Sequence, residues 1–204
     1  MEELLNMDDV FTVDLAELLS NGDSMDPVTY QYYKSLKDNT IVINEGICED
    51  ILEKAVLPLM QMDKDESVKH IDIYLNTEGG SVYDGFLLVD VIDKIKTDTT
   101  ITIMGMAASM GIYIAMAGHN NPNVKTVCYS HSVGLIHDGS YYINGSMHSA
   151  RDTFKFSERY EQKIKDYVLS HSAIDEDTYR DFDRVEAWMT AEDMVEYGIV
   201  DEIL

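Results

Sequence analysis

GMAASMG, residues 105–111, separates two apolar runs and decides the fold around it. The run before it, Ile101 to Met106, alternates isoleucine with threonine or methionine and is typical of a buried strand. The run after it, Ile112 to Ala117, has helical length and is followed by Gly118, a common helix stop. Small residues between the runs allow a sharp bend. The stretch therefore places Ser109 at a turn from strand to helix.

Two interpretations of Ser109 follow from this turn. In the first, the hydroxyl projects out of the turn, and backbone N–H groups at the helix start lie beside it and stabilise negative charge. This is the logic of a nucleophile elbow, with the pattern Ala-x-Ser-x-Gly in place of Gly-x-Ser-x-Gly. In the second, Ser109 is a helix N-cap whose hydroxyl accepts a backbone N–H from the next turn. The stretch alone leaves both open.

Composition limits the class of protein. A chain of 204 residues suits one domain or one domain with an appendage. It carries 38 acidic and 15 basic residues, a formal charge of −23, which argues against nucleic acid and anionic membranes as partners. Cys48 and Cys128 form neither a disulfide framework nor a zinc spacing, and they indicate a reducing compartment. With no signal peptide or membrane-spanning run recognisable, we expect a cytoplasmic protein.

Strands alternate with helices along the chain, which predicts an α/β domain with a largely parallel sheet. Residues 1–38 are expected to be a separate N-terminal segment, with the main domain at 39–204. The predicted strands are 40–44, 70–76, 101–106, 126–129, 133–136 and 199–204. The predicted helices are 50–62, 81–96, 112–117, 151–171, a short one from 175, and a last one that begins at Thr190 and stops at Gly198.

Three loops are expected at one edge of this sheet. The diglycine Gly79-Gly80 lies between a strand end and a helix start, as Ser109 does, and His137 directly follows a short apolar strand. In a parallel sheet, loops at the carboxyl ends of neighbouring strands line one edge. The N–H groups of Gly80 and Met110 are then expected to point at one carbonyl oxygen, as an oxyanion hole does. The simpler alternative for the diglycine is a tight turn with positive φ.

A serine nucleophile with a histidine base also needs a group that orients the imidazole. Spacing does not assign that group, because the C-terminal region holds Asp181, Asp183 and Glu186. The histidines show no metal-ligand spacing, so no metal site is expected.

Four motifs in this order resemble the caseinolytic protease proteolytic subunit (ClpP) family, in the ClpP/crotonase-like group of serine peptidases. The resemblance runs from about Thr40 to Leu204 and is carried by residues 73–82, IYLNTEGGSV; 105–111, GMAASMG; 135–137, LIH; and 188–201, WMTAEDMVEYGIVD. It implies a spiral of β-β-α units with a protruding helix-strand handle at about 138–171. It also implies an apolar pocket beside Met110 that suits apolar side chains.

The resemblance implies an ATP-dependent Clp-type serine endopeptidase subunit with Ser109 as nucleophile and His137 as base. It implies an oxyanion hole from the backbone N–H groups of Gly80 and Met110, and no cofactor. The family builds a homo-oligomer of stacked rings, a tetradecamer, around a closed chamber. A ring-shaped AAA+ ATPase unfoldase threads unfolded proteins and peptides into it.

The triad acid is where this chain departs from the family. The family has Asp there, and ungapped alignment from Trp188 places Glu186 at that position, with Asp183 or Asp181 as the alternative acid. The departure keeps a second function open, a structural or regulatory ring subunit with an impaired triad. A third is a crotonase-like acyl-CoA enzyme, which would use the paired N–H groups without Ser109.

Overall fold

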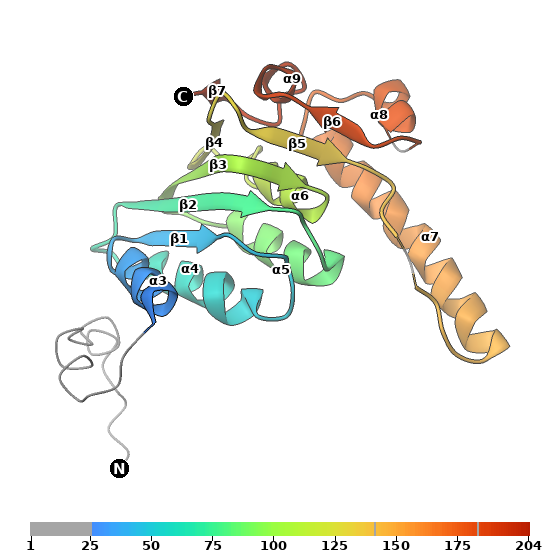
Figure 1. Ribbon diagram of the computed structural model, residues 1–204, viewed down its shortest axis with the longest axis horizontal. Coiled ribbons are helices and arrows are strands. Elements are labelled where there is room, and N and C mark those ends of the chain that lie inside the picture. Colours follow the sequence, from blue (N-terminus) through green and yellow to red (C-terminus); the bar gives the residue numbers. More distant parts are fainter. Residues whose placement is uncertain (1–25, 141, 183) are drawn as a thin grey trace, which may run out of the picture.

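The computed structural model describes residues 26–140, 142–182 and 184–204 (Figure 1). Most of the expected N-terminal segment and the alternative acid Asp183 lie outside the described residues. Within the described ranges, no helix is both long and apolar enough to cross a membrane.

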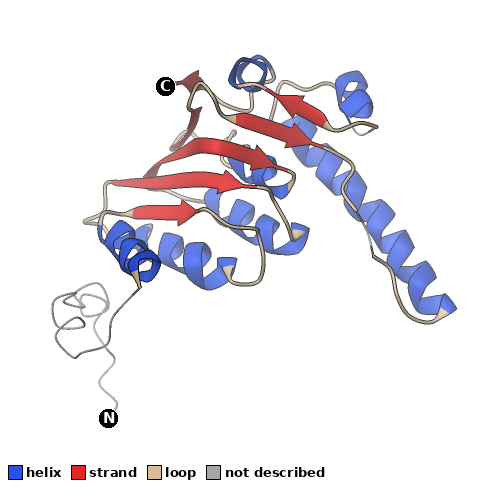
Figure 2. Cartoon of the chain, viewed as in Figure 1, coloured by secondary structure: helices blue, strands red, loops and turns tan. Residues whose placement is uncertain are grey.

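The strands of the described chain form one mixed sheet, with helices packed along it (Figure 2). The strands are β1 (Thr40–Ile43), β2 (His70–Thr77), β3 (Asp98–Ala108), β4 (Val124–Cys128), β5 (Val133–Ile136), β6 (Ala187–Met189) and β7 (Glu202–Ile203). The order β1-β2-β3-β4-β7 is parallel throughout, as expected for an α/β domain. β5 also pairs parallel with β3, and β6 pairs antiparallel with β5.

The helices are close to the expected ones. They are α3 (Pro27–Lys37), a π-helical turn (Leu52–Val56) that runs into α4 (Leu57–Met62), α5 (Val82–Ile92), α6 (Met110–Ala115), α7 (Met147–Ser170), α8 (Glu176–Phe182) and α9 (Ala191–Glu196). α9 begins with a capping box between Thr190 and Asp193. Helix α3 lies within the expected N-terminal segment and packs beside β1.

Strand β3 divides the sheet into two branches. Its first half pairs with β4, and its second half pairs with β5. Between the halves the register against β2 shifts, from Leu75 opposite Ile103 to Thr77 opposite Ala107. Gly105 adopts a φ of 120° in this bulge. The bulge lets β3 run on to Ala108, two residues further than predicted, so the strand ends immediately before Ser109.

Helices α4, α5 and α6 lie along one face of the sheet (Figure 1). Isoleucine and leucine side chains form the core between them and the sheet. The alternating residues Ile71, Ile73 and Leu75 of β2 are fully buried, as are Ile101 and Ile103 of β3. Each such side chain contributes about 1.5–3 kcal/mol of burial free energy. This core fixes the position of the β3–α6 turn.

Helix α7 is anchored at its C-terminal half, and its N-terminal half projects from the domain (Figure 1). Ile164 and Val168 are buried, and the ring of Phe86 on α5 contacts the ring of Tyr167 at 5.2 Å between centroids. The described residues between β5 and α7 form no strand, although the handle is expected to contain one. A strand needs a hydrogen-bonding neighbour, and the handle of the single chain provides only a helix.

Strand β6 was not predicted from the sequence. It has three residues, too few to show the alternation that identifies a strand. Its pairing with β5 is what brings the C-terminal region to the edge of the sheet where His137 lies.

Candidate active site

Ser109 and His137 form a hydrogen-bonded pair at the carboxyl edge of the sheet. The Oγ atom of Ser109 lies 2.9 Å from Nε2 of His137. Ser109 follows β3 and His137 follows β5, and these strands are neighbours. The Ser109 backbone nitrogen also donates to the carbonyl of Leu135 on β5, at 3.0 Å. Direct pairing of the two strands therefore brings the two side chains together.

The backbone of Ser109 has the conformation of a nucleophile elbow. Its φ is 54° and its ψ is −120°, and its side chain makes no capping bond to α6. The N-cap interpretation of Ser109 is therefore wrong. A non-glycine residue in such a region costs about 1–3 kcal/mol, and strain of this kind gathers at functional sites. The hydrogen bonds between β3 and its neighbouring strands hold the turn in this strained conformation.

Gly79 approaches the elbow so closely that no side chain fits. A Cβ atom at Gly79 would lie 2.5 Å from the carbonyl oxygen of Ala108 and 2.7 Å from Cβ of Ser109. Gly79 also has a φ of 95°, in the left-handed region that glycine tolerates. The diglycine thus makes both the tight turn and the contact with the nucleophile.

The backbone N–H groups of Gly80 and Met110 are both available for a ligand. The backbone N–H of Ile47 donates to the carbonyl of Gly79, and the carbonyl of Ile47 accepts the N–H of Ser81, both at 2.8 Å. Ile47 therefore bonds to the residues on both sides of Gly80. This parallel bridge turns the N–H of Gly80 away from Ile47. Across the described residues, neither Gly80 nor Met110 donates a backbone hydrogen bond outside its own helix or strand.

Thr77 is a positioning residue that the sequence reasoning missed. Its buried hydroxyl donates to the carbonyl of Glu45 at 2.7 Å and accepts the N–H of Gly79 at 3.0 Å. Its methyl group packs so close to Gly111 that a Cβ there would lie 2.6 Å away. Thr77 therefore ties the diglycine to the turn after Ser109. In the sequence it is only the last residue of an alternating strand.

The structure places Glu186 opposite His137, at the next position of the pairing between the adjacent strands β5 and β6. The antiparallel register pairs Ile136 with Ala187, so the next opposed positions are His137 and Glu186. Asp181 lies instead in the last turn of α8, and both carboxylates are exposed. Among the described residues, no carboxylate forms a hydrogen bond or an ion pair with His137.

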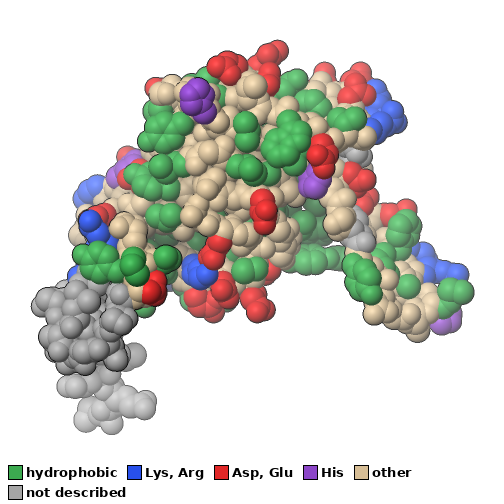
Figure 3. All heavy atoms as spheres, viewed as in Figure 1, with side chains coloured by type: hydrophobic (Ala, Val, Ile, Leu, Met, Phe, Trp, Pro, Cys, Tyr) green, Lys and Arg blue, Asp and Glu red, His purple; other side chains and the backbone are tan. Residues whose placement is uncertain are grey.

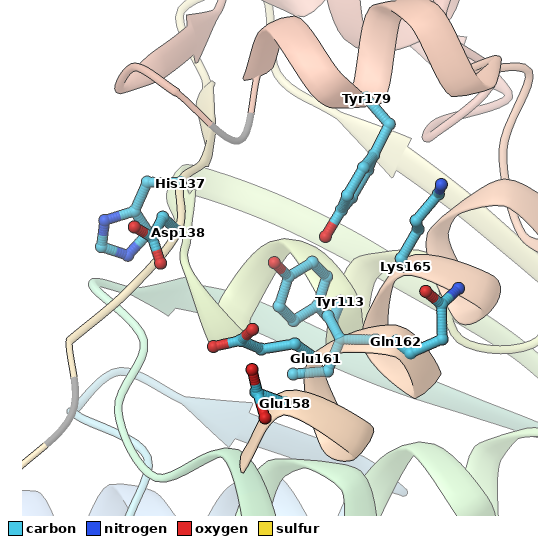
Figure 4. Close-up of a pocket in the computed structure, with 9 residues that line it drawn as sticks. Tyr113, His137, Asp138, Glu158, Glu161, Gln162, Lys165 and Tyr179 are labelled. Carbon is cyan, nitrogen blue, oxygen red and sulfur yellow. The ribbon is translucent and has the colours of Figure 1, made fainter. Parts of the chain in front are cut away.

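A polar pocket of about 420 Å³ adjoins His137 (Figure 4). It is lined by Tyr113, His137, Asp138, Glu158, Glu161, Gln162, Ile164, Lys165 and Tyr179. The apolar pocket expected beside Met110 stays a prediction. The buried side chain of Met110 packs over Gly85 of α5, where a Cβ would lie 2.2 Å from its Cγ, so it fills the space between two helices.

No group of three or more histidine, cysteine, aspartate and glutamate side chains in the described ranges is arranged to hold a metal ion.

Fold and site together define a class: an α/β protein with a serine–histidine pair on a nucleophile elbow at the carboxyl edge of its sheet. The chain belongs to the Clp protease family, whose model matches residues 24–204. Curated relatives carry the name ATP-dependent Clp protease proteolytic subunit. The protein of Streptococcus gordonii is 31% identical over 179 residues, which cover 85% of this chain and 88% of the relative.

Two more relatives with the same name give similar values. The protein of Lactococcus lactis subsp. cremoris is 32% identical over 179 residues, 85% of this chain and 86% of the relative. The protein of Streptococcus pyogenes serotype M5 is 30% identical over 184 residues, 85% of this chain and 88% of the relative. The family model, over residues 24–204, includes every strand of the sheet.

Proposed function

We propose that the protein is the proteolytic subunit of an ATP-dependent Clp-type serine endopeptidase. The observation that carries this proposal is the 2.9 Å contact between Ser109 Oγ and His137 Nε2 on a strained elbow. Family membership and the printed names of the relatives support the same activity.

In the proposed reaction, Ser109 Oγ attacks the carbonyl carbon of the scissile peptide bond while His137 Nε2 takes its proton. The N–H groups of Gly80 and Met110 donate to the oxyanion of the tetrahedral intermediate. His137 then gives the proton to the leaving nitrogen, the C–N bond breaks, and the acyl group stays on Ser109 as an ester. Water, deprotonated by His137, hydrolyses that ester and restores the serine hydroxyl.

We propose Glu186 as the triad acid, and its position opposite His137 in the continued β5–β6 register supports this proposal. Its role is to hold the imidazole tautomer and to stabilise the imidazolium that forms during each step. Substrate binding would draw the exposed carboxylate toward Nδ1, since catalytic hydrogen bonds are often loose in the free state. Asp181 and Asp183 are the alternative acids.

We further propose a homo-oligomer of stacked rings that receives unfolded chains from an AAA+ ATPase. The name of the relatives contains the words ATP-dependent and subunit, which supports an assembly that works together with an ATPase. Figure 3 shows hydrophobic side chains on the projecting part of the molecule. The exposed apolar residues of this part of α7, which support assembly, are Met147, Phe154 and Phe156. We place the protein in the cytoplasm, and the free thiols of Cys48 and Cys128 support a reducing compartment.

Peptide hydrolysis by wild type and by the variants Ser109→Ala, Glu186→Ala, Asp181→Ala and Asp183→Ala tests the proposal. Ser109→Ala is expected to lower kcat by about 10⁴-fold or more, and Glu186→Ala to lower it by at least about 10²-fold. If Asp181→Ala or Asp183→Ala has the larger effect, the acid is reassigned. An assembled wild type that cleaves no peptide and is not labelled at Ser109 by a fluorophosphonate contradicts the function and favours a regulatory ring subunit.

A further inference from the structure

Strand β3 changes its partner on one edge shortly before it reaches the nucleophile. It pairs with β4 as far as Ile103 and with β5 from Met106 onward (Figure 1). In the described chain, Met104 and Gly105 between these points have no partner residue on this edge. The pairing with β5 itself covers only three residue pairs. Few backbone hydrogen bonds therefore fix how far β5 lies along β3.

The hydroxyl of Ser132 fills the gap between the two pairings. It donates to the carbonyl of Ile103 at 2.8 Å and accepts the N–H of Gly105 at 3.3 Å, so it bonds to the backbone on both sides of Met104. Ser132 is only 2% exposed, and its backbone N–H donates to the carbonyl of Tyr129 at 2.9 Å, across the turn that joins β4 to β5. A buried hydroxyl whose partners are all in place is held rigidly.

Ser132 stands at the start of the strand that leads to the base. Strand β5 begins at the next residue and ends directly before His137, while β3 ends directly before Ser109. The Oγ atom of Ser109 and Nε2 of His137 lie 2.9 Å apart. A misplacement of reacting groups by about 1 Å costs on the order of 10²-fold in rate. The position of β5 along β3 therefore bears directly on the reactivity of Ser109.

We propose that Ser132 is a positioning residue for the catalytic pair, an inference that rests on the proposed peptidase function. Its hydroxyl fixes β5 along β3 and so sets the distance between Ser109 Oγ and His137 Nε2. Ser132 acts through the two strands and does not touch the reacting atoms. Within the described ranges, no other side-chain hydrogen bond joins β3 to residues 129–136.

The substitution Ser132→Ala tests this role, because it removes both hydroxyl bonds and adds no bulk. We expect kcat for a fluorogenic peptide to fall by at least about tenfold while KM stays within about twofold, since the lost positioning acts on the chemical step. The rate constant for labelling of Ser109 by a fluorophosphonate should fall by a similar factor. A merely structural role would reduce the fraction of protein that is labelled and would leave this rate constant unchanged.

Thr99→Val is the matched control at the other end of β3. Thr99 is also 2% exposed, and its hydroxyl donates to the carbonyl of Thr97 at 2.9 Å. Its labelling rate constant should stay within about twofold of the wild-type value. Ser132→Cys keeps a side chain at the position with a weak donor and acceptor, so it provides the test if Ser132→Ala does not fold. A wild-type labelling rate constant in Ser132→Ala or in Ser132→Cys overturns the inference.

Crystal structures of wild type and Ser132→Ala distinguish this inference from the proposed function. The distance between Ser109 Oγ and His137 Nε2 should exceed about 3.5 Å in the variant, beyond hydrogen-bond range, whether or not the wild type cleaves peptides. An unchanged distance overturns the inference and leaves the peptidase function standing. A longer distance in the variant of a wild type that neither cleaves peptides nor reacts with the fluorophosphonate supports the positioning role and contradicts the peptidase function.

Discussion

The side-chain oxygen of Asn76 lies 3.1 Å from the backbone nitrogen of Met106, one strand away, and holds the bulge of β3. The amide nitrogen of Asn76 donates to Asn44 Oδ1 at 2.6 Å, so one side chain connects β1, β2 and β3 near their carboxyl ends. Asn76→Ala removes both bonds and is expected to lower the free energy of unfolding by about 1–3 kcal/mol. Peptidase activity should fall as well, because the bulge directs β3 to Ser109.

Asn76→Asp keeps an acceptor for Met106 and loses the donor to Asn44, so it separates the two bonds. We expect it to retain more peptidase activity than Asn76→Ala when both are measured at neutral pH. Equal loss of activity in the two variants would show that the bond to Met106 does not position the elbow.

Gly79→Ala should damage both stability and activity. The added Cβ would lie 2.5 Å from the carbonyl oxygen of Ala108, at a residue with a φ of 95°. We expect a loss of about 3 kcal/mol or more in urea unfolding, from steric overlap and backbone strain together. Gly139→Ala is the stability control, because its φ is 77° but nothing lies within 4 Å of its Cβ. It should lose only about 1–2 kcal/mol from strain.

Asp63 should make folding more sensitive to acid. Its burial raises the pKa of the carboxyl, but backbone hydrogen bonds from Lys96 and Thr97, both 2.8 Å, outweigh burial and hold the pKa below its ordinary value. Because the pKa of Asp63 is lower in the folded protein than in the unfolded chain, the carboxylate stabilises the folded state. This contribution to the free energy of unfolding is complete above the unfolded pKa, about 3.9, and is lost as the pH falls through the folded pKa.

Asp63→Asn keeps an oxygen acceptor and removes the titration. The difference in unfolding free energy from wild type should be about 1 kcal/mol above about pH 5 and should shrink as the pH falls toward 2. Chemical denaturation across this range checks it. A difference that stays constant down to pH 2 would contradict the role of the Asp63 charge.

Tyr167 should anchor helix α7 through its hydroxyl. The Oη atom donates to the carbonyl of Tyr113 at 3.0 Å. Burial raises the pKa of the Tyr167 phenol well above its usual value, so the hydroxyl stays protonated as a donor. Tyr167→Phe should therefore lower the free energy of unfolding by about 1–2 kcal/mol in urea.

Tyr83→Phe is the matched control for Tyr167→Phe. Tyr83 is 61% exposed and contacts the ring of Tyr160 at 5.3 Å between centroids. Because its ring contact survives the substitution, the change should stay within about 0.5 kcal/mol. An equal decrease in the free energy of unfolding in the two variants would contradict the role assigned to the Tyr167 hydroxyl.

Local patterns in the sequence were sufficient to predict most elements of the fold. The alternating isoleucines before Ser109 predicted β3, and the capping residues at Thr190 predicted α9. The sequence also predicted that Ser109 and His137 follow strands of one parallel sheet, and the structure shows that these strands, β3 and β5, are neighbours. Their contact follows from that topology, because the carboxyl ends of parallel strands meet at one edge. The oxyanion-hole and triad roles of the site residues stay predictions.

Tertiary structure alone decided the details on which the site depends. The sequence shows neither the bulge in β3 nor strand β6, since both are defined by hydrogen bonds to distant segments. It also left open whether the Ser109 hydroxyl caps its own helix or meets a histidine 28 residues away. Thr77 gains its positioning role in the same way. Periodicity and small residues determine local elements, whereas register and long-range packing determine which side chains meet.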